Sequence, residues 1–154
     1  MITCKEKKTM KASQIFCMQI ASEDKKKRGY ILAISCVKDM IEGYICCDER
    51  ENEFFAESAG AKFSDGSVTF LVTGKENKKG YRLRLGQPLY SDGGKYLGQI
   101  DDFTIKSNRI VSAHSGKRKF AFDKLVLNDV AILKSGDYST EIAAKDMFIG
   151  AMLG

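Results

Sequence analysis

Apolar and polar residues alternate along most of the chain in short spans, and Gly, Asn, Asp or Ser residues separate one span from the next. This pattern is typical of β-strands joined by tight turns. It is clearest between Tyr81 and Lys134, where no catalytic motif interrupts it. The stretch that begins at Ser13 has the same pattern, so the sequence predicts an all-β protein.

The two stretches align with each other as an internal repeat, at an offset of 69 residues in their first halves. The matches at this offset include Gly29 with Gly98, Ile20 with Leu89, Ile31 with Ile100, Ile34 with Phe103 and Cys36 with Ile105. With residues lost in turns, the alignment continues through Ile45 with Ile110, Phe55 with Phe120, Val68 with Val130 and Phe70 with Ile132. We therefore expect two copies of one small β module, at residues 12–75 and 81–135.

A shared irregularity supports the repeat. Ile31 and Ile34 are three residues apart, as are Ile100 and Phe103, so strict alternation would place each pair on opposite faces of its strand. A β-bulge in each copy would resolve the conflict, and the bend that it adds suits a small closed barrel. The prediction is two small β-barrels in tandem.

Glycines predict two further local features. Gly29 and Gly98 lie just inside a strand, where a missing side chain usually admits a neighbouring backbone or ring. Asp92-Gly93 predicts a tight hairpin turn between alternating flanks.

The two ends of the chain depart from the repeat. The polar, basic stretch from Met1 to Lys11 predicts a frayed leader or short arm, with regular structure from about Ala12. In the tail, residues 136–154, Asp137 or Ser139 can cap a short helix with an apolar face. That face comprises Ile142, Ala143, Met147, Phe148, Ala151 and Met152. The alternatives are a helix that docks within the chain and an apolar segment that binds a second molecule.

Length and composition set the broad class. A chain of 154 residues with 44% hydrophobic residues suits one ordinary domain or two very small ones. No run of apolar residues is long enough for a transmembrane helix, and the first residues lack the apolar core of a signal peptide. We therefore expect a cytoplasmic protein.

The net charge of +5 is too modest to indicate nucleic-acid binding by itself. Basic residues cluster in turns, and such runs are usually solvated. Arg82 and Arg84 share one face of a predicted strand, and Lys117, Arg118 and Lys119 fall in the same repeat. If these five residues meet, they form a basic patch able to bind phosphates or an acidic protein surface.

The side chains that could support catalysis lack the spacing that catalysis needs. The five cysteines form no CxxC pair and are odd in number, which disfavours both a disulfide scaffold and a zinc site. Cys17, Cys36 and Cys46 occupy apolar positions, so we expect buried, reduced thiols. His114 is the sole histidine, and a nucleophilic pair with Cys46 or Cys47 would need an orienting third group.

A cation site is likewise disfavoured, because the adjacent carboxylates of Asp101 and Asp102 should point to opposite faces of a strand. We expect no catalytic residues, no metal and no cofactor, and hence no enzyme.

The second copy resembles the PRC-barrel family, the β-barrel fold shared by the photosynthetic reaction-centre H subunit and the C-terminal domain of the ribosome maturation factor. The resemblance rests on the segments LGQPLYSDG (85–93) and LGQIDDF (97–103), and it continues through Ile110-Val111, Phe120-Ala121-Phe122 and Val130 to Leu133. It implies a tandem pair of PRC-like barrels that lacks conserved catalytic residues and acts by docking in protein assemblies or in ribosome-linked RNA metabolism.

These observations predict a non-catalytic module for protein binding or assembly, monomeric or homodimeric, with a protein partner that the sequence does not identify. The alternative is an RNA- or ribosome-associated factor that uses the basic turns of the barrels.

Overall fold

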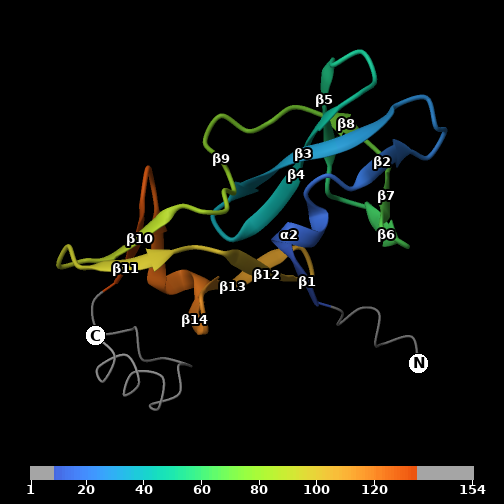
Figure 1. Ribbon diagram of the computed structural model, residues 1–154. Coiled ribbons are helices and arrows are strands. Elements are labelled where there is room, and N and C mark those ends of the chain that lie inside the picture. Colours follow the sequence, from blue (N-terminus) through green and yellow to red (C-terminus); the bar gives the residue numbers. More distant parts are fainter. Residues whose placement is uncertain (1–8, 135–154) are drawn as a thin grey trace. The chain divides into compact units, whose positions relative to one another are not determined.

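The computed structural model describes residues 9–134, and its regular structure consists mostly of β-strands, which confirms the all-β class (Figure 1). The chain divides into two compact units. One comprises Ala12–Arg84 and is called the N-terminal unit here. The other comprises Met1–Lys11 with Leu85–Gly154 and is called the C-terminal unit. The predicted tail lies outside the described residues.

The N-terminal unit is a curled, mainly antiparallel sheet. Its strand order is β6-β7-β2-β3-β4-β5-β8, and β9 pairs with the far half of β3. The elements are α2 (Ala12–Ile15), β2 (Gln19–Ser22), β3 (Arg28–Val37), β4 (Met40–Cys47), β5 (Glu53–Glu57), β6 (Lys62–Ser64), β7 (Ser67–Phe70), β8 (Thr73–Gly74) and β9 (Tyr81–Arg82). The pairing of β2 with β7 is parallel.

The C-terminal unit has two groups of paired strands, β1-β12-β13-β14 and β11-β10-β16-β15. The elements are β1 (Thr9–Lys11), β10 (Pro88–Ser91), β11 (Tyr96–Gln99), β12 (Asp102–Lys106), β13 (Arg109–Ser115), β14 (Arg118–Ala121), the 3₁₀ helix η1 (Phe122–Lys124), β15 (Leu125–Leu127) and β16 (Ala131–Leu133). Here too one pairing is parallel, between β10 and β16.

The strand β1 corrects the prediction of a frayed leader up to Lys11. Thr9, Met10 and Lys11 pair with β12, so these three residues form a strand and not a frayed end. A three-residue strand is too short to show alternation, and its partner lies far away in the sequence.

The two units share backbone hydrogen bonds at matched positions. In the N-terminal unit the Cys17 N–H donates to the Ile31 carbonyl at 2.9 Å, and 69 residues later the Gly86 N–H donates to the Ile100 carbonyl at 2.6 Å. Both donors have a positive φ, 68° at Cys17 and 85° at Gly86. The same unusual backbone conformation therefore recurs in both copies.

A second shared contact joins the first hairpin of each unit to its last strand. The Glu23 N–H donates to the Phe70 carbonyl at 3.1 Å, and the Asp92 N–H donates to the Leu133 carbonyl at 3.0 Å. Phe70 therefore corresponds to Leu133 and not, as the sequence alignment had it, to Ile132. Burial agrees, because Phe70 and Leu133 are both buried and Ile132 is half-exposed.

The middle of the alignment also shifts. Cys36 pairs with Ile41, and Ile105 pairs with Ile110, so the match for Ile110 is Ile41 and the offset of 69 persists. The two hairpins are equally long, and the length difference falls in the next turn, between β4 and β5.

The bulge predicted between Ile31 and Ile34 is confirmed, because the register of β3 on β4 shifts between Ile31 and Ala33. In the second copy the corresponding residues Ile100 and Asp101 interrupt the strand and separate β11 from β12. The bulge in one copy and the interruption in the other both bring two apolar residues that are three positions apart to the buried face. The four residues concerned are all buried: Ile31, Ile34, Ile100 and Phe103.

Gly29 and Gly98 each have a steric reason to be glycine. A Cβ on Gly29 would collide with the carbonyl of Cys47 on the neighbouring strand β4. Gly98 has φ = +119°, and its Cβ would lie 3.0 Å from the Ser115 Oγ. In the predicted 92–93 turn the positive φ falls one residue later, at Gly94 (93°).

None of the helices in residues 9–134 is long and apolar enough to cross a membrane.

Candidate functional site

The five residues of the predicted basic patch fall in different units. Arg82 and Arg84 belong to the N-terminal unit, and Lys117, Arg118 and Lys119 belong to the C-terminal unit.

Arg82 is already occupied by an intramolecular partner. Its Nε and Nη2 atoms donate to the two carboxylate oxygens of Glu76, both at 3.0 Å, and the same contact lowers the pKa of Glu76. Arg82 lies on β9, which pairs with Ser35 and Cys36 of β3. This arginine therefore fastens residues 76–82 to the sheet.

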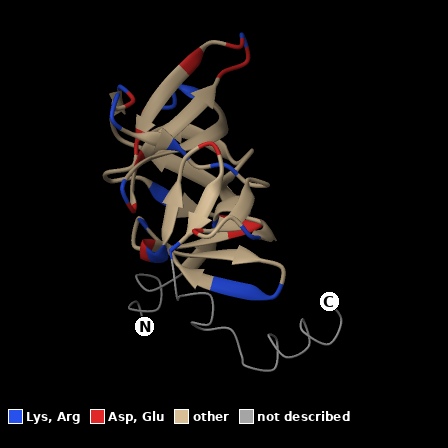
Figure 2. Ribbon diagram, turned by 90° about the vertical axis from the view of Figure 1, so that its left-hand side faces the viewer, with Lys and Arg blue, Asp and Glu red and all other residues tan. Residues whose placement is uncertain are grey.

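The C-terminal group is more open. Lys117 and Lys119 are exposed and Arg118 is half-exposed, at the turn into β14. Figure 2 shows this run of basic residues in blue, whereas acidic red dominates the turn between β4 and β5.

The thiols are poorly suited to nucleophilic chemistry. Burial raises the pKa of Cys36 and of Cys46 to about 12, so both remain protonated at neutral pH. The prediction that these two thiols are buried is confirmed. For Cys17 it is wrong, because this side chain is exposed. Gly86 is the residue that matches Cys17 in the other copy, and both have a positive φ. A glycine at the matching position is the sequence signal that could have indicated a turn, and hence an exposed side chain, at Cys17.

His114 and the acidic pair have structural partners. The His114 Nε2 lies 2.6 Å from the Thr104 hydroxyl, and burial lowers the pKa of the ring. The Asp101 carboxylate accepts the Gly116 N–H at 2.6 Å, and that of Asp102 accepts the Phe103 N–H at 2.9 Å. Within residues 9–134 no three His, Cys, Asp or Glu side chains are grouped as metal ligands.

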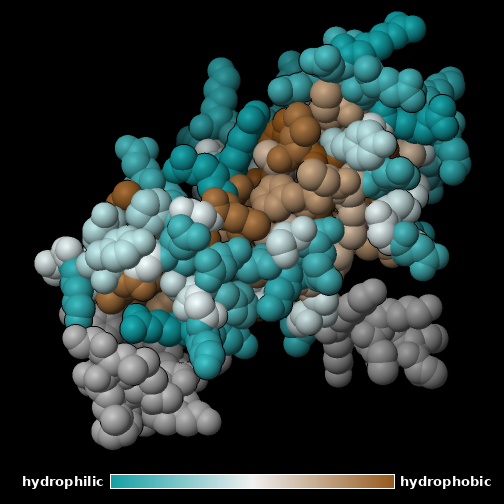
Figure 3. All heavy atoms as spheres, in the orientation of Figure 1, coloured by the Kyte–Doolittle hydropathy of each residue, from teal (hydrophilic) through white to brown (hydrophobic). Residues whose placement is uncertain are grey.

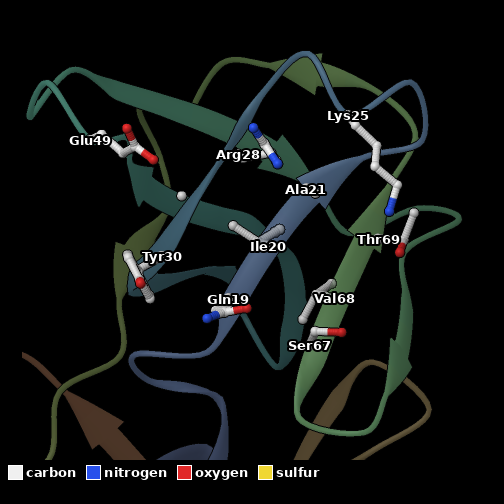
Figure 4. Close-up of a pocket in the computed structure, with 11 residues that line it drawn as sticks. Gln19, Ile20, Ala21, Lys25, Arg28, Tyr30, Glu49, Ser67, Val68 and Thr69 are labelled. Carbon is white, nitrogen blue, oxygen red and sulfur yellow. The ribbon is translucent and has the colours of Figure 1, made fainter.

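The N-terminal unit contains a polar pocket of about 430 Å³ that the sequence analysis did not identify (Figure 4). It lies on the outward face of β7, β2 and β3 and on the turns beside them. Its lining residues are Gln19, Ile20, Ala21, Lys25, Arg28, Gly29, Tyr30, Glu49, Ser67, Val68 and Thr69. Strand pairing sets the side chains in rows: Thr69, Ala21 and Arg28 are neighbours across three strands, and so are Ser67, Gln19 and Tyr30.

The matching face of the C-terminal unit is apolar. Strand pairing forms a row of four side chains on this face, one from each of β15, β16, β10 and β11. In that order they are Val126, Ile132, Tyr90 and Tyr96. The rings of Tyr90 and Tyr96 pack edge to face with centroids 5.4 Å apart, and Tyr96 is 60% exposed. In Figure 3 the surface near β10 and β11 is mostly pale, with small brown areas of hydrophobic residues.

The two faces occupy equivalent positions of the repeat. In the N-terminal unit the corresponding row across β6, β7, β2 and β3 is Lys62, Thr69, Ala21 and Arg28. One backbone arrangement therefore presents a basic polar row in one unit and an apolar aromatic row in the other. Strand register must be known before this contrast can be seen.

A scan against models of protein families finds no match to this chain, and a search of curated proteins finds no matching relative.

Proposed function

We propose that this chain is a non-catalytic protein-binding module of the PRC-barrel type, which docks a partner protein on the outward face of β11-β10-β16-β15. The observation that supports this most is the apolar row formed by Val126, Ile132, Tyr90 and Tyr96. Exposed tyrosines next to aliphatic side chains are typical of interface centres, because their rings bury a large area at little entropic cost.

The chemistry of the row defines the partner. No charged side chain interrupts these four positions, so the complementary surface is an apolar patch or the apolar face of an amphipathic segment on another protein. Such an interface depends little on ionic strength.

The absence of catalysis is part of the proposal. It is supported by the raised pKa of Cys36 and Cys46 and by the hydrogen bond that holds the His114 ring against Thr104. An activated nucleophile needs a lowered pKa or a free neighbouring base.

The second candidate is binding to RNA through the C-terminal basic group. Lys117, Arg118 and Lys119 are consecutive, and the two lysines are exposed. Contacts of this kind weaken steeply as salt rises, because bound counterions are released from the phosphates.

The test measures binding of the partner found by affinity purification, with both proteins purified, at low and moderate salt. We expect Tyr96→Asp to weaken the complex about tenfold or more, since it replaces the most exposed ring of the apolar row by a charge. The matched control is Tyr30→Asp, which changes an exposed tyrosine of the other unit. If Tyr96→Asp binds like the wild type, the proposed face is wrong.

Two further outcomes identify other partners. Steep salt dependence, with loss of binding in Lys117→Glu, supports RNA and contradicts protein docking. A homodimer that Tyr96→Asp converts to a monomer in light scattering identifies a second copy of this chain as the protein on the face.

A further inference from the structure

The polar pocket of the N-terminal unit is chemically unlike the apolar face, and we propose that it binds a single nucleotide with one phosphate. This inference does not depend on the protein-docking proposal. It rests on two cations among the lining residues, Lys25 at one side of the pocket and Arg28 between Lys25 and Glu49, together with an exposed ring at the other side and several hydrogen-bonding groups.

The phosphate position is defined by Lys25 and Arg28. Both line the pocket, and among residues 9–134 neither forms an ion pair, so their charges are available to a ligand. In Figure 4 the Lys25 side chain points toward Thr69. Ala21 separates Thr69 from Arg28 across the sheet, and its small side chain leaves room between them. An ammonium, a guanidinium and a hydroxyl form a set of donors that suits one phosphate group.

The backbone that presents these cations is held in place. Lys25 has φ = 63°, and its N–H donates to the Ser22 carbonyl at 2.9 Å. The neighbouring Asp24 carboxylate accepts the Ser22 hydroxyl at 2.6 Å and the Lys26 N–H at 2.9 Å. The turn is therefore ordered by its own hydrogen bonds before any ligand binds.

The ring position is defined by Tyr30, which is 51% exposed and lies in the row next to the phosphate position. The two rows are two residues apart along each strand, about 7 Å. This is roughly the span that a ribose places between a phosphate and a base. Stacking of a base on the tyrosine ring needs no particular base, because every base has a π-face.

The remaining polar side chains of the pocket can form hydrogen bonds to the base and the sugar. They are Gln19, Ser67 and Glu49. Gln19 pairs with both Ser67 and Tyr30 across the sheet, so its amide can donate to and accept from the edge of a stacked base. In Figure 4 the Glu49 carboxylate lies on the Tyr30 side, away from Lys25, where it can accept hydrogen bonds from sugar hydroxyls.

The surrounding charge favours one phosphate over a chain of them. Glu49 belongs to the acidic turn between β4 and β5, which is mostly red in Figure 2 and also contains Asp48, Glu51 and Glu53. A longer polyanion would be repelled there, whereas a single phosphate at Lys25 and Arg28 would not. We therefore expect a free mononucleotide to bind at least as well as one within an RNA strand.

Calorimetry or NMR titration of the full chain tests the site with four probes: AMP, adenosine, inorganic phosphate and a short single-stranded oligoadenylate. We expect AMP to bind with a Kd of about 1 mM or tighter. Adenosine and phosphate should each bind about tenfold or more weakly than AMP, because each lacks half of the contacts. Absence of AMP binding overturns the proposal. Equal binding of phosphate alone also overturns it, since the ring would then contribute nothing.

Variants assign the binding to this pocket. Arg28→Gln and Tyr30→Ala should each weaken AMP about tenfold or more while retaining the wild-type melting temperature. The controls are Lys78→Gln, an exposed cation of the same unit outside the pocket, and Tyr96→Ala on the other unit, both expected to bind AMP normally. Much tighter binding of the oligonucleotide than of AMP contradicts the single-nucleotide site and favours RNA.

Discussion

At the scale of single residues, position in the repeat explains side chains that look chemically active in the sequence. Cys36 occupies the position that Ile105 has in the other unit, and both are buried. Desolvation is the main cause of its raised pKa, followed by the nearby Glu42 carboxylate. The thiol fills an apolar position and stays protonated, as a small hydrophobic side chain would.

The rate of thiol labelling should therefore differ between exposed and buried cysteines. At pH 8 we expect a thiolate-specific reagent to modify Cys17 rapidly, since it is exposed, and to leave Cys36 and Cys46 largely unmodified, since their pKa is about 12. Peptide mass spectrometry of native protein, with urea-unfolded protein as the control, measures this. Labelling of Cys36 at the rate of Cys17 would refute the assignment.

His114 links stability to pH. Burial, followed by repulsion from Lys11 and Lys119, lowers the pKa of its ring, whereas Asp102 and Asp101 oppose the shift. The unfolded chain therefore binds a proton at His114 more readily than the folded chain does. The neutral ring contributes fully to the free energy of unfolding above the unfolded pKa of about 6.5, and this contribution is lost as the pH falls below that value.

We expect the free energy of unfolding to fall between pH 7 and pH 5 by more in the wild type than in His114→Gln, which cannot titrate. Urea unfolding at both pH values measures the difference. The same pH dependence in both proteins would remove His114 as its cause.

At the scale of elements, close approach of strands determines where glycine is required. Gly29 on β3 faces the carbonyl of Cys47 on β4, which is backbone and cannot move aside. Gly98 combines a positive φ with a contact to Ser115. Equivalent positions therefore need glycine for different reasons.

Gly98→Val should destabilise the protein by more than about 1 kcal/mol, because it adds backbone strain and a clash. Gly29→Ala should do the same through collision alone. The control is Gly93→Ala, where φ is ordinary and the nearest atom to a Cβ is 3.8 Å away. Chemical denaturation compares them, and a Gly98→Val midpoint equal to that of Gly93→Ala would contradict the argument.

At the scale of the whole molecule, the sequence predicted what depends on local alternation and missed what depends on pairing. The bulge between Ile31 and Ile34 was predicted because side chains on a strand alternate with a period of two, which would otherwise place one of these two apolar residues on the solvent face. The strand at Thr9–Lys11 was missed because its partner is β12, and the pocket was missed because Thr69, Ala21 and Arg28 become neighbours only through the register of three strands. The basic patch was predicted from a shared strand face and a shared repeat, and the ion pair of Arg82 with Glu76 could not be foreseen from either.

We propose that equivalent faces of the two units bind different ligands. The most direct test measures binding of AMP and of the partner protein by three purified chains: wild type, Arg28→Gln and Tyr96→Asp. We expect Arg28→Gln to weaken only the binding of AMP and Tyr96→Asp to weaken only the binding of the partner, each by about tenfold or more. If either substitution weakens both ligands equally while the fold is intact, or neither weakens any, the two faces are not separate binding sites and the account is wrong.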